Sequence, residues 1–191
     1  MSVSKVGIRD QLLAGRRRRS LADVGEAAQA IAGHLLAAPE VRRAATVAAY
    51  VSMGTEPGTG RLLEALLERG TRVILPLLRP DNDLDWAVHT GALLPARRGL
   101  LEPGGPPLGV DAVATADVVL VPGLAVSPAG DRLGRGGGSY DRALARVPVG
   151  TPVWILLYDE EVGVAVPVEP HDRAVTGAAT PSGIVRLRRA F

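Results

Sequence analysis

The chain contains 191 residues, of which 47% are hydrophobic and only 3% are aromatic. A chain of this length and composition can bury one core built mainly from valine, leucine and alanine, so we expect residues 1–191 to form a single domain. The formal net charge of +2 provides no overall field for holding nucleic acid, and the absence of cysteine excludes disulfides, thiol nucleophiles and thiolate metal sites.

The N-terminal region is polar and basic. It lacks the apolar segment of a secretory signal, and no stretch of the chain reaches the ~18 consecutive apolar residues of a membrane span. We therefore expect a cytoplasmic protein with no membrane partner.

The run Arg16–Arg19 lies where a first predicted helix, residues 4–17, ends, and cations are favoured at that end of a helix. Because no aromatic residues accompany the run, we do not interpret it as a nucleic-acid site.

The chain then alternates between helical and extended patterns. Ser20 and Asp23 form a predicted capping box for a second helix, whose apolar residues recur at helical spacing until Pro39 ends it. A strand, a helix and a strand follow, at residues 45–53, 59–70 and 71–78. This unit predicts two parallel strands joined by a right-handed crossover.

The second half of the chain is less regular at first and then returns to the same alternation. We expect a strand at 84–89, a loop at 101–109, a buried strand at 117–121, a helix at 139–147 and another buried strand at 151–159. The repeated alternation predicts an α/β fold, a three-layer sandwich with a mostly parallel central sheet flanked by helices.

The stretch RLGRGGGSYDRALAR, residues 132–146, lies between a predicted buried strand and a predicted helix. Open α/β sheets bind ligands at such strand ends, where glycines let the backbone approach a phosphate and Arg132 and Arg135 can add charge-assisted hydrogen bonds. The loop is neither common phosphate motif, since Ser139 stands where a dinucleotide fingerprint has its third glycine and no Gly-Lys-Ser/Thr is present. A glycine-rich surface turn is the structural alternative, and the flanking arginines favour the phosphate site over it.

Lys5 and Arg9 form a second candidate phosphate contact, because they lie four residues apart on a predicted helix and share one face. Lys5 is the only lysine among 22 basic residues, which indicates a role that suits a compact ammonium better than a guanidinium. The alternative is a solvated side chain near the terminus. His34, His89 and His171 show no metal-ligand spacing, and we interpret them as structural or surface residues.

The stretch PGLAVSPAGDRLGRGGGSYDR, residues 122–142, resembles the signature of the 5-formyltetrahydrofolate cyclo-ligase family. Three further segments resemble that family in the same order: KVGIRDQLLAGRRRRS, VAAYVSMGTEPGT and VPVEPHDRAV. The resemblance covers nearly the whole chain. It implies an ATP- and Mg²⁺-dependent enzyme that phosphorylates the formyl oxygen of 5-formyltetrahydrofolate and closes the ring to 5,10-methenyltetrahydrofolate, with release of ADP and phosphate.

The resemblance also implies a set of site residues. ATP is expected at Lys5, Arg9, Arg132, Leu133, Gly134, Arg135, Gly136, Gly137, Gly138, Ser139 and Tyr140. Arg132 and Tyr140 are the expected catalytic residues. The reduced folate is expected at Val51, Met53, Glu56 and Tyr140, and Mg²⁺ at Asp141 and Asp172. The expected partners are these two small-molecule substrates, with the protein itself a monomer.

The three acidic residues have simpler interpretations from the sequence pattern alone. Asp141 is typical of the first turn of a helix, Asp172 of a turn and Glu56 of an exposed loop, and only the resemblance favours their roles in a site.

The chain departs from the family pattern at three positions. Ser139 and Val126 replace residues that are often aromatic, and Arg135 replaces a frequent tyrosine, so we expect weaker closure around the folate. Two alternative functions stay open at this point. One is a paralogue that binds ATP or folate without cyclising it, and the other is an unrelated α/β protein that binds a phosphorylated metabolite and has no folate pocket around Glu56.

Overall fold

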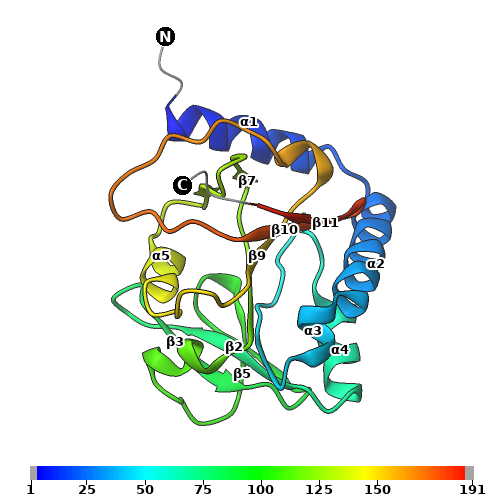
Figure 1. Cartoon of the computed structure of the whole chain (residues 1–191), viewed down its shortest axis with the longest axis vertical. Helices are drawn as coiled ribbons and strands as arrows, with labels where there is room; N and C mark the ends of the chain where they lie inside the picture. Colours follow the sequence, from blue (N-terminus) through cyan, green and yellow to red (C-terminus); the bar gives the residue numbers. More distant parts are fainter. Residues whose placement is uncertain (1–3, 188–191) are drawn as a thin grey trace.

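The computed structural model describes residues 4–187. Its centre is a seven-stranded sheet with the strand order β11-β10-β9-β6-β1-β2-β3 (Figure 1). The strands are β1 (Thr46–Ala48), β2 (Arg72–Leu78), β3 (Leu84–Val88), β6 (Val118–Val121), β9 (Val153–Leu156), β10 (Gly177–Thr180) and β11 (Gly183–Arg186). The five strands from β10 to β2 run parallel to their neighbours, whereas β3 and β11 are antiparallel edge strands.

Helices cover both faces of this sheet. The α-helices are α1 (Lys5–Arg17), α2 (Leu21–Ala37), α3 (Pro39–Arg43), α4 (Gly60–Glu68) and α5 (Ser139–Leu144), and the 3-10 helices are η1 (Arg97–Gly99), η2 (Val110–Thr115) and η3 (Asp159–Glu161). Figure 1 shows α2, α3 and α4 together on one side of the sheet and α5 on the other.

The alternation of side chains along β6 explains why both faces need cover. Val118 and Leu120 are buried in the cluster that contains α2, α3 and α4, while Val119 and Val121 are buried in the cluster that contains α5 and η2. Successive residues of a strand point to opposite faces, so a strand without polar positions requires a layer on each side. The predicted three-layer α/β sandwich with a mostly parallel sheet is therefore confirmed.

The predicted start of the second helix is also confirmed. The Ser20 hydroxyl accepts a hydrogen bond from the backbone N–H of Asp23, and the Asp23 carboxylate accepts one from the backbone N–H of Ser20. Pro39 follows the end of α2, as expected, and is at the same time the first residue of α3, where its missing N–H is no loss.

The predicted strand at 45–53 is wrong in its second half, because β1 ends at Ala48. The Thr59 hydroxyl donates to the carbonyl of Tyr50 at 2.8 Å and accepts from the backbone N–H of Ser52 at 2.9 Å. These bonds tie the segment after β1 to the start of α4 instead of to a neighbouring strand. The segment therefore leaves the sheet at its carboxyl edge.

Smaller differences between the predicted and the observed elements concern the end of α5 and short strands whose pairing cannot be read from local sequence patterns. The predicted helix at 139–147 ends at Leu144, and the predicted loop at 101–109 begins with β5 (Leu101–Pro103), which pairs with β4 (Leu93–Pro95). A second hairpin joins β7 (Ala125–Val126) to β8 (Arg132–Leu133). The sequence analysis did not predict β10 or β11.

Helix α1 lies across one end of the molecule (Figure 1). Its Ile8 packs with Leu124, Ala125 and Leu133, and so joins the helix to the β7–β8 hairpin. At the other end of α1, Arg16 is buried, so the arginine run is more than the exposed, cationic end of a helix. Within residues 4–187, none of the helices combines the length and apolar character that crossing a bilayer requires.

An ion pair fixes the far end of α5 to the turn between β2 and β3. The guanidinium of Arg146 donates to both carboxylate oxygens of Asp83, at 2.7 and 2.6 Å. These hydrogen bonds lower the pKa of Asp83 from its ordinary value of 3.8 to about 2. Because α5 directly follows the glycine loop, residues 134–138, this pair helps to fix that loop relative to the sheet.

The Asp83–Arg146 pair predicts a pH dependence of stability. A carboxyl whose pKa is lowered by folding stabilises the folded state above its unfolded pKa, and this contribution is lost as the pH falls through the folded value. Asp83 should therefore contribute fully above about pH 5 and lose its contribution by about pH 2. Asp83→Asn should therefore make the free energy of unfolding, measured by urea titration, vary less with pH over this interval. Asp10→Asn, at an exposed position of α1, is the control and should leave the pH dependence unchanged.

Candidate active site

A cavity of about 800 Å³ opens at the carboxyl edge of the parallel strands. Its walls come from α1, the segment after β1, the ends of β2 and β3, the strap between β4 and β5, the glycine loop with the start of α5, and the segment at 169–172. Every residue that the sequence analysis assigned to the site lines this cavity, namely Lys5, Arg9, Val51, Met53, Glu56, Arg132, Leu133, Gly134, Arg135, Gly136, Gly137, Gly138, Ser139, Tyr140, Asp141 and Asp172. The side chain of Leu133 is itself in the core against Ile8, so this residue can offer a ligand mainly its backbone.

The glycine loop takes a backbone conformation that other residues rarely adopt. Gly136 and Gly138 have φ values of 103° and 74°, and Gly138 is the N-cap of α5. At Gly134 a Cβ would come within 2.8 Å of the Arg132 guanidinium. Glycine is therefore favoured at the first two positions by conformation, and at the third a Cβ would require the Arg132 side chain to shift.

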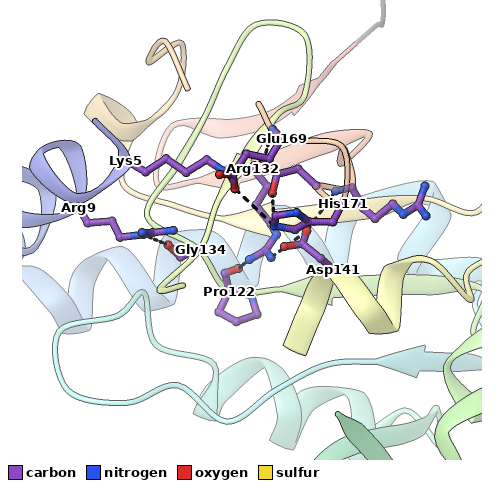
Figure 2. Close-up of polar contacts among 10 residues, drawn as sticks. Lys5, Arg9, Pro122, Arg132, Gly134, Asp141, Glu169 and His171 are labelled. Carbon is purple, nitrogen blue, oxygen red and sulfur yellow. Dashed lines mark hydrogen bonds and ion pairs between the residues drawn. The ribbon is translucent and has the colours of Figure 1, made fainter. Parts of the chain in front are cut away.

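Arg132 lies beneath this loop with its side chain only 6% exposed. Its Nη1 donates to the carbonyl of Pro122 at 3.0 Å, its Nη2 lies 3.5 Å from Oδ1 of Asp141, and its Nε has no hydrogen-bond partner among the described residues (Figure 2). Burial lowers the pKa of the guanidinium, and the charge of Asp141 opposes this only in part. The site thus contains a buried cation that the protein does not fully pair.

Helix α1 brings two more cations to the cavity, as the four-residue spacing predicts. The Arg9 Nε donates to the carbonyl of Gly134 at 2.8 Å, which fixes the glycine loop to α1. The Lys5 ammonium donates to Asp172 at 2.6 Å and to Glu169 at 2.8 Å (Figure 2). Burial disfavours the charge of Lys5, but the hydrogen bonds to the two carboxylates outweigh it and raise the pKa of Lys5.

The two predicted metal ligands lie together in space. Asp141, His171 and Asp172 each offer a ligand atom, and these atoms lie within 4.8 Å of one another. The backbone N–H of Arg173 donates to Oδ1 of Asp141 at 3.1 Å and so joins the start of α5 to the C-terminal segment. The sequence analysis placed His171 at the surface, where it is indeed exposed, but missed its position beside the two aspartates. The only feature of the sequence that pointed to this position of His171 was that it precedes Asp172.

The opposite wall of the cavity contains Glu56, which is buried although it lies in a turn. Its Oε2 accepts a hydrogen bond from the backbone N–H of Met53 at 2.8 Å, while its Oε1 lies 3.4 Å from the Arg135 guanidinium. Burial, together with the charge of Glu56, raises the pKa of Tyr140. One oxygen of Glu56 is thus used to shape the turn, and the other faces the exposed Arg135 side chain.

Much of the remaining wall is apolar and was not predicted. It includes the apolar residues Tyr50, Pro76, Leu78, Leu84, Leu100 and Leu101, together with the cationic Arg98. The strap that carries the last three is held by Glu102, whose carboxylate accepts from the backbone N–H of Leu78 at 2.9 Å. Of the three positions where this chain lacks an expected aromatic residue, Arg135 and Ser139 line the cavity, whereas Val126 is buried in the core.

A buried arginine, a glycine loop and paired carboxylates thus lie together at the carboxyl edge of an α/β sheet, an arrangement whose charges suit anionic groups together with a cation. The sequence model of the 5-formyltetrahydrofolate cyclo-ligase family matches residues 1–181. The chain therefore belongs to the 5-formyltetrahydrofolate cyclo-ligase family, as the signature around the glycine loop implied.

Individual relatives match along almost the whole chain. A 5-formyltetrahydrofolate cyclo-ligase of Mycolicibacterium smegmatis is 43% identical, with 97% of this chain and 98% of that protein aligned. One of Escherichia coli K12 is 33% identical, with 88% of this chain and 97% of that protein aligned. The NMR structure of the Aquifex aeolicus 5,10-methenyltetrahydrofolate synthetase superposes with a TM-score of 0.83 at 25% identity, covering 98% of this chain and 94% of that one.

The contacts of Lys5 predict a measurable pKa. Because Lys5 is the only lysine, a ¹³C label at the lysine Cε gives a single NMR signal to titrate. In the protein without ligand, the pKa of Lys5 should lie above the ordinary value of 10.5, and Asp172→Asn should lower this pKa. Glu169→Gln should have a smaller effect, since Glu169 is half exposed and its hydrogen bond contributes less. An unchanged pKa in Asp172→Asn would show that the ammonium is solvated.

Proposed function

We propose that this protein catalyses the ATP- and Mg²⁺-dependent cyclisation of 5-formyltetrahydrofolate to 5,10-methenyltetrahydrofolate, with release of ADP and phosphate. The observation that carries the proposal is that one cavity joins a cationic, glycine-lined end to an apolar end with a buried carboxylate. A nucleotide phosphate suits the first end and a pterin the second, so the two substrates can meet between them. The family membership and the 43% identical relative support the same reaction.

The cationic end supplies the contacts that phosphoryl transfer needs. We assign the ATP phosphates to the glycine loop 134–138, to Arg132 below it, and to Lys5 and Arg9 from α1. Arg132 requires no reorganisation to receive an anion, because it is already buried and only partly paired. Preorganised donors of this kind stabilise the charge that develops on a transferring phosphoryl group.

The other end suits the folate. The Oε1 atom of Glu56 is available to accept hydrogen bonds from the N–H groups of the pterin, while Val51, Met53, Leu100 and Leu101 offer apolar surface. Tyr140 lies between the two ends, and its raised pKa keeps its hydroxyl protonated as a donor. We therefore assign Tyr140 to both substrates.

In the proposed reaction the formyl oxygen attacks the γ-phosphorus of ATP, and ADP leaves. The nitrogen at position 10 of the folate then attacks the activated formyl carbon and loses its proton, after which the carbon–oxygen bond breaks and releases phosphate. Arg132 and the loop hold the phosphoryl oxygens through both steps, while Glu56 fixes the orientation of the ring. The geometry requires no protein nucleophile.

The carboxylates of Asp141 and Asp172 fit a magnesium ion, which takes oxygen ligands and commonly combines one or two carboxylates with phosphate oxygens. Bound there, the ion would neutralise charge on the transferring phosphoryl group. Asp172 currently accepts from Lys5 through Oδ2, and its Oδ1 is the atom nearer His171. An imidazole is not a preferred ligand of magnesium, so we assign His171 no direct role in holding it.

Family membership removes one of the two alternatives, an unrelated protein that binds a phosphorylated metabolite. A paralogue without activity is distinguished by assay. The monomeric state and the cytoplasmic location stay predictions.

A direct test follows the methenyl chromophore after mixing the protein with 5-formyltetrahydrofolate, ATP and magnesium. We expect chromophore formation that requires all three components. Asp141→Asn should lower kcat on the order of tenfold or more and raise the magnesium concentration needed, because an anionic ligand becomes a neutral one. Asp10→Asn, an exposed position on α1, is the control. A magnesium titration identical to that of the unmodified protein would remove Asp141 from the metal site.

The substitution Glu56→Gln tests whether the two ends of the cavity bind different substrates. This change preserves size but removes the charge that accepts from the pterin, so folate binding should weaken by roughly 1–3 kcal/mol while ATP binding stays the same. Equilibrium titrations with each ligand measure both effects. Glu64→Gln, at an exposed position of α4, serves as the control. An equal loss of both ligands would indicate a folding defect and contradict the assignment.

A further inference from the structure

A buried network lies behind the folate end of the cavity and begins at Arg16, within the arginine run. Arg16 is 2% exposed. Its guanidinium donates to both oxygens of Glu161, at 2.8 and 2.9 Å, and to the carbonyl of Gly123 at 2.7 Å. Arg132 donates to the preceding carbonyl, that of Pro122. Two buried arginines thus hold consecutive carbonyls of the segment after β6, which lines the cavity.

The network continues from Glu161 to Tyr158, a residue that the proposed reaction does not use. Oε2 of Glu161 accepts from the backbone N–H of Tyr158 at 3.0 Å. The Tyr158 side chain is fully buried, with the Arg19 guanidinium 3.6 Å from its ring centroid. Burial, opposed by the nearby arginines, raises the pKa of Tyr158, so its hydroxyl stays a donor.

That hydroxyl donates to the carbonyl of Thr55 at 2.7 Å, across 103 residues of sequence. Thr55 is next to Glu56 in a turn whose other hydrogen bonds are internal. The backbone N–H of Glu56 donates to the carbonyl of Met53, and the N–H of Met53 donates to the Glu56 carboxylate. The internal bonds fix the shape of the turn, whereas the bond from Tyr158 fixes its position relative to the sheet.

We propose that Tyr158 is a positioning residue for folate recognition, whose hydroxyl holds the Thr55–Glu56 turn where the Glu56 carboxylate meets the pterin. The Arg16–Glu161 pair holds Tyr158 in place and ties it to the helix that carries Lys5 and Arg9. The inference rests on the proposed function and adds to it a residue outside the cavity wall. The chemistry it serves is recognition of the pterin N–H groups by Glu56, rather than binding of ATP.

The decisive variant is Tyr158→Phe, which removes one hydroxyl and leaves the ring and the Arg16–Glu161 pair. The KM for 5-formyltetrahydrofolate should rise roughly 2- to 10-fold, the usual range for the loss of one neutral hydrogen bond. The KM for ATP should not change, and kcat should stay nearly the same because substrate is still oriented once bound. A rise in both KM values by the same factor would overturn the proposal in favour of a general structural role.

Thr176→Val is the control. The Thr176 hydroxyl donates to the carbonyl of Val153 at 3.2 Å and accepts from the backbone N–H of Val153 at 2.9 Å, at the opposite end of β9 from Tyr158. The variant removes both side-chain hydrogen bonds of a residue that does not line the cavity, so both KM values should stay unchanged. If this variant raises the folate KM as much as Tyr158→Phe does, the effect is not specific to the turn and the proposal fails.

A double-mutant cycle with Glu56→Gln separates this inference from the function on which it rests. If Tyr158 acts through Glu56, its effect on the folate KM should shrink in the Glu56→Gln background. Full additivity would overturn the inference alone. If Glu56→Gln by itself leaves folate binding unchanged, the assignment of Glu56 fails and the role of Tyr158 fails with it.

Discussion

The site depends on the burial of the Arg132 guanidinium beneath the glycine loop. Removing a charge from water is costly unless partners replace the lost hydration, and among the described residues Arg132 has the Pro122 carbonyl, a carboxylate of Asp141 at 3.5 Å and the Tyr140 ring. An anion in the cavity, as proposed for the ATP phosphates, would be a further partner. The guanidinium also lies close to Gly134, where a Cβ would come within 2.8 Å of it, and Arg9 fixes the same residue from α1. These contacts shape the cationic end of the cavity in the absence of a ligand.

The two ends of the cavity are held together by buried polar contacts, since loops alone would not keep them at a fixed separation. Arg132 and Arg16 hold the segment after β6, and Arg16 continues through Glu161 and Tyr158 to the turn with Glu56. In contrast, two ion pairs lie inside the cavity, where ligands could replace one partner of each: Arg135 with Glu56, and Lys5 with Asp172. The buried contacts thus fix the shape of the cavity, whereas the ion pairs inside it can open for ligands. A reaction between two bound substrates requires such a fixed geometry.

Local patterns were sufficient to predict the alternating fold, the capping box at Ser20 and the position of the glycine loop, because each depends on residues close together in the sequence. The early end of β1 depends on Thr59, which takes the hydrogen bonds that a longer strand would have used. His171 beside Asp141, and Arg16 with Glu161, were not predictable in this way. Arg16 and Glu161 lie 145 residues apart, and a basic run at a helix end gives no sign that one member is buried.

In the proposed reaction the cavity brings the formyl oxygen of the folate to the γ-phosphate of ATP. A heavy-oxygen label in the formyl group, followed by mass spectrometry of the products of a single turnover, tests this transfer. The label should appear in the released inorganic phosphate. Unlabelled phosphate, with the label recovered in water or formate, would show that the formyl oxygen is not the phosphate acceptor.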